Sequence, residues 1–160
     1  MTARSAQDDP HAGVAAAPGS LLLDDQLCFA LYAASRAVTA RYRPLLDELG
    51  LTYPQYLVML VLWDRDGSTV SDLGKALQLE SSTLSPLLKR LEAAGLLRRE
   101  RRPDDERSVA LYLTDAGAAL RERAAAVPTS MGDAMGLTAE EDATAKRLLR
   151  LLTAHVAQDR

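Results

Sequence analysis

Hydrophobic residues recur at three- and four-residue spacing over long parts of the chain, which is the pattern of amphipathic helices. This pattern predicts helices over residues 21–48, 55–63, 72–77, 82–94, 114–127 and from 138 toward the C-terminus. We expect a bend or break near Pro44, because proline removes a backbone donor from a helix. Residues able to cap a helix N-terminus precede four of these segments: Thr52, Ser71, the run 81–83 (Ser-Ser-Thr) and Thr114.

The hydrophobic period changes to two after Gly95, in LLRRERRPDDERSVALYLT. A turn-like centre at residues 102–105 is followed by alternation of Val109, Leu111 and Leu113 with Ser108, Ala110 and Tyr112, which predicts a β-hairpin. The order of helix, short helix, helix and hairpin is that of a winged helix-turn-helix. We therefore predict a mainly α fold with a small β-hairpin wing.

Composition agrees with one helical domain over residues 21–160, preceded by a disordered arm over residues 1–20 that is rich in Ala, Pro, Gly, Asp and Ser. No apolar run is long enough to span a membrane, and the N-terminus does not resemble a secretory signal. The chain has one cysteine, Cys28, which fits a reducing cytoplasm. The net charge of −3 argues weakly against nucleic acid, but it can hide a local basic patch.

The helix over residues 82–94 has one leucine face, formed by Leu84, Leu87, Leu88 and Leu91. The opposite face carries small or basic residues, which can approach base edges and phosphates without steric conflict. The candidate DNA contacts in and beside this helix are Ser81, Ser82, Thr83, Ser85, Pro86, Lys89 and Arg90. The alternative is an ordinary amphipathic helix with a solvated polar face.

Five arginines cluster in the predicted hairpin: Arg98, Arg99, Arg101, Arg102 and Arg107. Arginine on a narrow protruding loop suits the negative potential of the DNA minor groove. Asp105 can hold Arg107 in position through a charge-assisted hydrogen bond. We select Arg101, Arg102, Asp105 and Arg107 as candidate DNA-binding residues, against the alternative of a charge-mixed surface hairpin.

At this point the sequence resembles a known family over residues 21–156. DDERSVALYLTDAG is similar to the wing of MarR-type regulators, and LCFALY with TYPQY is similar to their organic-hydroperoxide-sensing branch, OhrR. The resemblance implies a homodimeric repressor that binds double-stranded DNA. Its dimerisation helices would lie at 21–48 and 114–157, and its DNA-binding part at 52–113. It implies that helix 82–94 enters the major groove of a pseudo-palindromic operator and that Arg107 reaches the minor groove.

Cys28 lies among phenols: Tyr32 is one helical turn away, and Tyr42 would point within roughly 40° of the same direction on a straight helix. A phenol can donate a hydrogen bond to a thiolate. The resemblance implies that Cys28 senses an organic hydroperoxide, that Tyr42 and Tyr53 bond it from the partner subunit, and that Tyr32 is a further phenol of the site. Because no second cysteine is present, a low-molecular-weight thiol would cap the oxidised sulfur.

Three other interpretations remain open for these residues. Cys28 can be an inert core residue, as free cysteines usually are. The tyrosines and Trp63 can line a pocket for an aromatic or phenolic ligand that releases the repressor. A thiol peroxidase would need a His or Arg partner for its sulfur; His11 and His155 are poorly placed, which leaves Arg36 and Arg41. We expect no enzyme, and the scattered histidines predict neither a metal site nor a cofactor.

Overall fold

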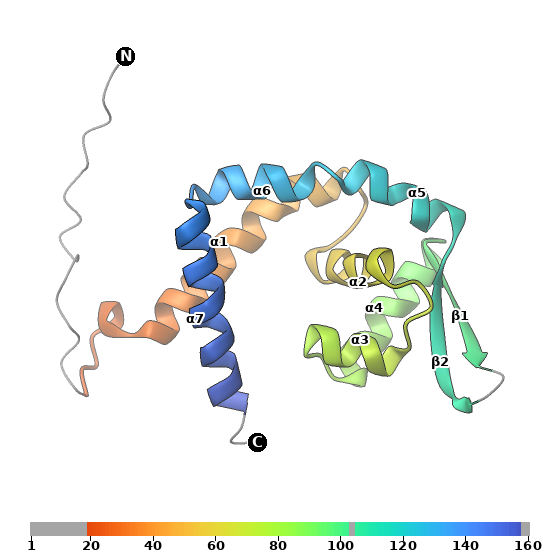
Figure 1. Cartoon of the computed structure of the whole chain (residues 1–160), viewed down its shortest axis with the longest axis horizontal. Helices are drawn as coiled ribbons and strands as arrows, with labels where there is room; N and C mark the ends of the chain where they lie inside the picture. The colour runs from red at the N-terminus through yellow and green to blue at the C-terminus, as the bar shows by residue number, and fades with distance from the viewer. Residues whose placement is uncertain (1–18, 103–104, 158–160) are drawn as a thin grey trace, which may run out of the picture. The chain divides into compact units, whose positions relative to one another are not determined.

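The computed structural model describes residues 19–102 and 105–157, and it leaves the side chains of residues 102–107 undescribed. Residues 1–37 and 38–160 form two compact units. The elements are a short 3-10 turn η1 (Leu23–Asp25), α1 (Leu27–Asp47), α2 (Tyr53–Asp64), α3 (Val70–Leu77), α4 (Ser81–Ala93), β1 (Leu97–Arg102), β2 (Asp105–Leu113), α5 (Asp115–Ala124), α6 (Val127–Met135) and α7 (Ala139–Ala157) (Figure 1). The predicted fold class is confirmed, whereas residues 1–18 of the predicted arm lie outside the described residues.

The first predicted helix differs from α1 at two points. The observed helix α1 begins at Leu27, whereas the predicted helix began at Leu21. The side-chain amide of Gln26 donates hydrogen bonds to the carbonyls of Ser20 and Leu22 and so holds the preceding segment in η1. Of the bend or break expected near Pro44, the break does not occur, because α1 continues through Pro44 to Asp47. A proline within a helix removes one backbone hydrogen bond, and the remaining turns carry α1 past it.

Two of the predicted helix caps are confirmed and two are wrong. Thr52 forms a capping box with Gln55 before α2, and Thr114 accepts a hydrogen bond from the Gly117 amide before α5. Ser71 does not cap α3, because Thr69 and Asp72 form a capping box two residues earlier. The run 81–83 does not cap α4 either; these residues lie in its first turn, after Glu80.

The predicted helix over residues 114–127 corresponds to α5 alone, and the sequence pattern did not predict the next helix, α6. α5 ends at Ala124, and α6 begins at Val127 with Pro128 in its first turn. Pro128 has no N–H to donate to the Ala124 carbonyl, so the helical bonding is interrupted there. The expectation of a last helix from residue 138 is confirmed by α7, which follows Thr138.

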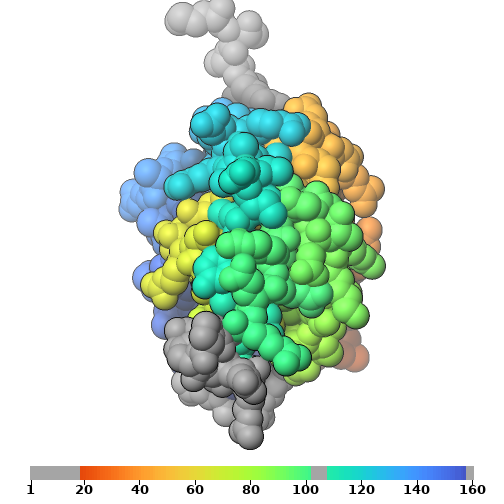
Figure 2. All heavy atoms as spheres, turned by 90° about the vertical axis from the view of Figure 1, so that its right-hand side faces the viewer, coloured from red at the N-terminus to blue at the C-terminus, as the bar shows by residue number. Residues whose placement is uncertain are grey.

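The hairpin is antiparallel, with Leu97 opposite Leu113 and Arg101 opposite Val109. The predicted alternation describes only part of β2, because Leu111 and its neighbour Ala110 are both buried. The α2–α3 turn explains this burial: Gly67 and Ser68 exchange backbone hydrogen bonds with Leu111 at 2.9 Å each, so β2 is covered on a second side. Figure 2 shows the yellow residues around this turn beside the hairpin.

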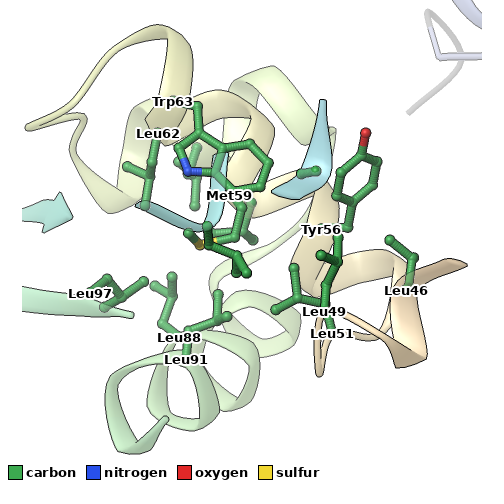
Figure 3. Close-up of a cluster of buried hydrophobic side chains, with 14 of the residues drawn as sticks. Leu46, Leu49, Leu51, Tyr56, Met59, Leu62, Trp63, Leu88, Leu91 and Leu97 are labelled. Carbon is green, nitrogen blue, oxygen red and sulfur yellow. The ribbon is translucent and has the colours of Figure 1, made fainter. Parts of the chain in front are cut away.

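A leucine-rich core joins α2 to α4 and to the hairpin. Met59 and Leu62 of α2 are fully buried and pack with Leu88 and Leu91 of α4 and with Leu97 of β1 (Figure 3). Trp63 lies at the C-terminal end of the same helix, and its indole N–H donates to the Gly117 carbonyl oxygen at 2.9 Å. This core fixes α4 and the hairpin relative to α2.

Candidate nucleic-acid interface and redox site

Helix α4 presents the two faces that its sequence predicts. Its leucine face is buried, with Leu84 and Leu91 completely inaccessible. The predicted DNA contacts are all exposed: Ser81, Ser82, Thr83, Ser85, Pro86, Lys89 and Arg90. Small side chains along the first two turns leave room for a close approach, and the two cations follow on the third turn. Contact of these residues with DNA remains a prediction.

The structure describes the side chains of only some of the predicted DNA-binding residues of the wing. Arg101 is exposed on β1. The side chains of Arg102, Asp105 and Arg107 lie outside the described residues, and with them the predicted hydrogen bond between Asp105 and Arg107. Their backbone belongs to the hairpin, in which Arg102 is the register partner of Asp105.

Arg99 is tied to α4 through an ion pair that sequence reasoning missed. Its Nε and Nη2 atoms lie 2.9 and 2.5 Å from Oε2 of Glu92. The Arg99 guanidinium holds the pKa of the Glu92 carboxyl below its usual range. The pair joins the end of the exposed helix to the first strand of the wing, beside the core contacts that fix the two elements.

Arg98 is engaged within the hairpin itself. Its Nε atom lies 3.0 Å from Glu100, and its guanidinium carbon lies 5.0 Å from the centre of the Tyr112 ring. At the base of the wing, Asp66 accepts hydrogen bonds from the backbone amides of Gly67 and Leu113 at 3.1 and 2.8 Å. In the sequence, Asp66 followed by Gly67 indicates a turn. The local sequence does not show that the Asp66 carboxylate binds the backbone of β2.

Cys28 lies on α1 in the unit of residues 1–37, where its side chain is exposed and makes no disulfide. Tyr32 follows one turn later and is also exposed. Arg36 contacts this phenol twice, because its Nη1 atom donates to the hydroxyl oxygen at 2.9 Å and its guanidinium carbon lies 5.5 Å from the ring centre. With a lone pair of the Tyr32 oxygen taken by Arg36, the phenolic hydrogen is free to donate to an anion.

The other two predicted phenols, Tyr42 and Tyr53, belong to residues 38–160 and pack together with ring centres 4.6 Å apart. Tyr56 joins them, 5.9 Å from Tyr42, although sequence reasoning did not select it. Burial, and then the neighbouring Tyr53, raises the pKa of Tyr42. Burial likewise raises the pKa of Tyr56, so both phenols are protonated at neutral pH and can donate hydrogen bonds.

Two hollows adjoin the aromatic cluster. One of about 260 Å³ is lined by Tyr53 together with Arg43 and Asp47. The other, of about 250 Å³, runs between α2 and α5 and is lined by Tyr56, Trp63 and Arg121, among others. Within the described ranges no group of His, Cys, Asp and Glu side chains is arranged to hold a metal ion. The helices of residues 19–157 include none with the length and apolarity needed to cross a membrane.

A helix-turn-helix formed by α3 and α4, an exposed small and basic face on α4 and a hairpin wing together define a winged-helix DNA-binding protein. Residues 40–123 match the family described as transcriptional regulator SarA/Rot. The organic hydroperoxide resistance transcriptional regulator of Bacillus subtilis (strain 168) is 48% identical over 126 residues, which cover 79% of this chain and 84% of that protein. The chain belongs to the MarR-type winged-helix transcriptional regulators, in the branch of the organic hydroperoxide resistance regulators.

Solved structures give the same grouping. AbfR of Staphylococcus epidermidis, in the structure of its reduced form bound to DNA, is 37% identical to this chain. The two structures match with a TM-score of 0.72 over 85% of this chain and 93% of the AbfR chain. PcaV of Streptomyces coelicolor, in complex with its natural ligand, is 26% identical with a TM-score of 0.77, over 84% and 96% of the two chains.

Proposed function

We propose that the protein is a transcriptional repressor that binds operator DNA while Cys28 is reduced and releases it after an organic hydroperoxide has oxidised Cys28. The observation that carries this proposal is the exposed Cys28 thiol on α1, in a chain whose winged helix presents a DNA-compatible face. An exposed sulfur can meet a peroxide, whereas one packed in the core could not. The similarity to a hydroperoxide resistance regulator and to DNA-bound AbfR supports both halves of the proposal.

The chemistry requires one thiolate and one peroxide. The Cys28 thiolate attacks one oxygen of the O–O bond, that bond breaks, and the leaving alkoxide takes a proton to become an alcohol. Sulfur is oxidised to the sulfenic acid and the peroxide is reduced. A low-molecular-weight thiol then displaces water from the sulfenic acid to form a mixed disulfide, because Cys28 is the only cysteine in the sequence. While this mixed disulfide persists, Cys28 stays modified, so the event signals the peroxide and does not by itself complete a catalytic cycle.

Three phenols would support the thiolate. Tyr32 lies one turn from Cys28 and has its oxygen oriented by Arg36. Tyr42 and Tyr53 would donate from the partner subunit of a homodimer, as the resemblance implies, and the raised pKa of Tyr42 keeps that phenol protonated. A thiolate that accepts such bonds is favoured over the neutral thiol.

The DNA complex would use a dimer. Helices within residues 21–48 and 114–157 would form its interface, and the exposed leucines of α7 favour this because they have no cover in a single chain. Each α4 would enter the major groove of one half-site, with half-sites about one DNA turn apart. Arg101, Arg102 and Arg107 would reach the minor groove, supported by Asp105. Because a repressor acts on DNA inside the cell and a lone cysteine fits a reducing compartment, we place the protein in the cytoplasm.

In a second candidate function the protein is again a repressor, but it responds to a small ligand and not to a peroxide. The groove lined by Tyr56, Trp63 and Arg121 is large enough for a small aromatic or phenolic ligand, and the structure of PcaV contains that protein's natural ligand. In that case Cys28 would be inert and the ligand would release the operator.

Operator binding by wild type and Cys28→Ser, at one fixed salt concentration, tests the proposal. Each protein is measured before and after treatment with cumene hydroperoxide and a small thiol. We expect wild type to lose the operator and Cys28→Ser to keep it. If both proteins release the DNA, or neither does, Cys28 is not the sensor and the ligand-released repressor becomes the better account. Salt is held constant because phosphate contacts make the affinity steeply salt-dependent.

A further inference from the structure

Aromatic side chains form a continuous stripe along α2. Tyr53, Tyr56 and Trp63 project from one side of this helix, because their spacing places them within about 80° of each other around its axis. Tyr42 packs on Tyr53 and Tyr56, and Tyr56 meets Trp63 edge to face with ring centres 6.2 Å apart. The stripe spans about 15 Å, from the predicted sensing phenols to the C-terminal end of the helix.

At that end Trp63 holds the start of α5. Its indole N–H donates to the Gly117 carbonyl at 2.9 Å, in a buried bond between residues 54 apart in sequence. Gly117 lies directly on the junction between α4 and β1, where a Cβ atom would collide with the Leu96 carbonyl oxygen. Thr114 bonds the same junction, since its hydroxyl donates to the Gly95 carbonyl at 2.6 Å. A displacement of Trp63 therefore reaches the residues that link the exposed helix to the wing.

The turn after α2 is bonded to the wing as well. Asp66 accepts from the Leu113 amide at 2.8 Å, and the Gly67 amide donates to the Leu111 carbonyl at 2.9 Å. The C-terminal end of β2 is thus attached to the turn that directly follows the helix carrying the aromatic stripe. These bonds join backbone and side-chain atoms within the protein, so they transmit position and do not read sequence.

We propose that α2 is the lever that carries the oxidation state of the sensor to the DNA-reading elements, with Trp63 as its positioning residue. This inference rests on the proposed function. When Cys28 is oxidised, the phenols that bond its thiolate change partners, and Tyr42 and Tyr53 move against Tyr56. Because a close-packed core cannot absorb the change by compression, α2 shifts as a unit. The Trp63–Gly117 bond then moves the α4–β1 junction, and the Asp66–Leu113 bond moves the wing.

Trp63→Phe is the first test, because phenylalanine keeps an aromatic ring and removes only the indole donor and part of the volume. The quantity measured is the ratio of operator affinities of the reduced and the oxidised full-length protein. We expect Trp63→Phe to lower this ratio by about 2- to 30-fold. The rate of Cys28 sulfenic acid formation, followed by trapping with dimedone and mass spectrometry, should match wild type. Asp66→Ala is the second variant. Because Asp66 is exposed, we expect this variant to fold.

Met131→Leu serves as the control, since Met131 is a buried residue of α6 outside the stripe and the substitution nearly conserves volume. Wild type that keeps its operator after oxidation overturns the proposed function itself. Wild type that releases it, with Trp63→Phe and Asp66→Ala releasing it in the same ratio, overturns the lever alone. An equal change in Met131→Leu assigns the effect to general core packing and also overturns the lever. If Trp63→Phe does not fold, the ratio for Asp66→Ala decides.

Discussion

Two helical glycines of this protein differ in whether a side chain has room. Gly117, in α5, is pressed against the Leu96 carbonyl, whereas an added Cβ at Gly132, in α6, meets nothing within 4 Å. Glycine at the first site is required by a close backbone approach, and glycine at the second only lowers helix propensity. The same residue type therefore has opposite consequences at two positions that look alike in sequence.

We predict that Gly117→Ala lowers the free energy of unfolding by about 1–3 kcal/mol, the usual range for overpacking a core. Gly132→Ala should raise it by about 0.4–1 kcal/mol, because alanine reduces the entropy of the unfolded chain. Urea unfolding of both variants beside wild type measures the two changes. Equal effects of the two substitutions would contradict the close packing of α5 on the α4–β1 junction.

The role of Cys28 could be predicted only in part from the residues around it. Its sequence context left open whether it is an inert core residue or a sensor, since both occur in apolar helical segments. The structure leaves its side chain exposed, so the core of a single chain does not account for it. The sensing role itself came from the resemblance to the hydroperoxide regulators, because no local pattern distinguishes a reactive thiol from an unreactive one.

At the scale of single elements, α3 depends on a capping box that local sequence reasoning placed two residues too late. Thr69 accepts from the Asp72 amide at 3.1 Å, and the Asp72 carboxylate accepts from the Thr69 amide at 3.2 Å. The hydrogen bonds from Thr69 lower the pKa of Asp72 from its ordinary value of 3.8. Because α3 is only eight residues long, its N-terminus contributes a large share of its hydrogen bonding.

Thr69→Ala is expected to lower the free energy of unfolding by about 1 kcal/mol at neutral pH. Ser71→Ala is the matched control, since Ser71 is exposed in the first turn and does not cap the helix. Asp72 has a lowered pKa in the folded protein, so its contribution is complete above pH 3.8 and is lost as the pH falls through the folded value. Thermal unfolding from pH 6 to pH 3 should therefore show a smaller acid loss in Thr69→Ala than in wild type; parallel curves would refute the capping role.

At the scale of the whole molecule, α7 leaves large apolar side chains without cover. Leu148, Leu149 and Leu151 are each about half exposed, and Val156 is 66% exposed. A monomer rarely keeps such a surface open to water along one helix. A second copy of the chain, joined through α7 and α1, would bury it and would set the distance between two α4 helices.

Leu149→Glu should weaken this association, because it places a charge within the proposed apolar interface. We expect a shift toward monomer in sedimentation velocity and a loss of operator affinity of at least tenfold, since two half-sites would no longer be bound together. Leu60→Glu, a change at a 40% exposed residue of α2 outside the proposed interface, is the control and should remain dimeric. A dimeric Leu149→Glu protein would show that α7 does not form the interface.

Sequence alone determined the order and type of the helices and strands other than η1 and α6, the division of α4 into a leucine face and a small, basic face, and the caps at Thr52 and Thr114. These features depend on periodicity and on hydrogen bonds between residues about three or four apart, so a short window of sequence contains their causes. The misplaced cap of α3 and the missed helix α6 also have local causes, since Thr69 and Ser71 compete for the cap and Pro128 separates α6 from α5.

Only the tertiary structure decided how the predicted parts are connected. The Glu92–Arg99 pair, the Asp66–Leu113 bond and the Trp63–Gly117 bond join residues 7, 47 and 54 positions apart. The burial of Ala110 and the addition of Tyr56 to the phenol pair arise in the same way, from elements that meet only after the chain has folded back. Local propensities do not encode such contacts, because their geometry depends on the packing of the whole core.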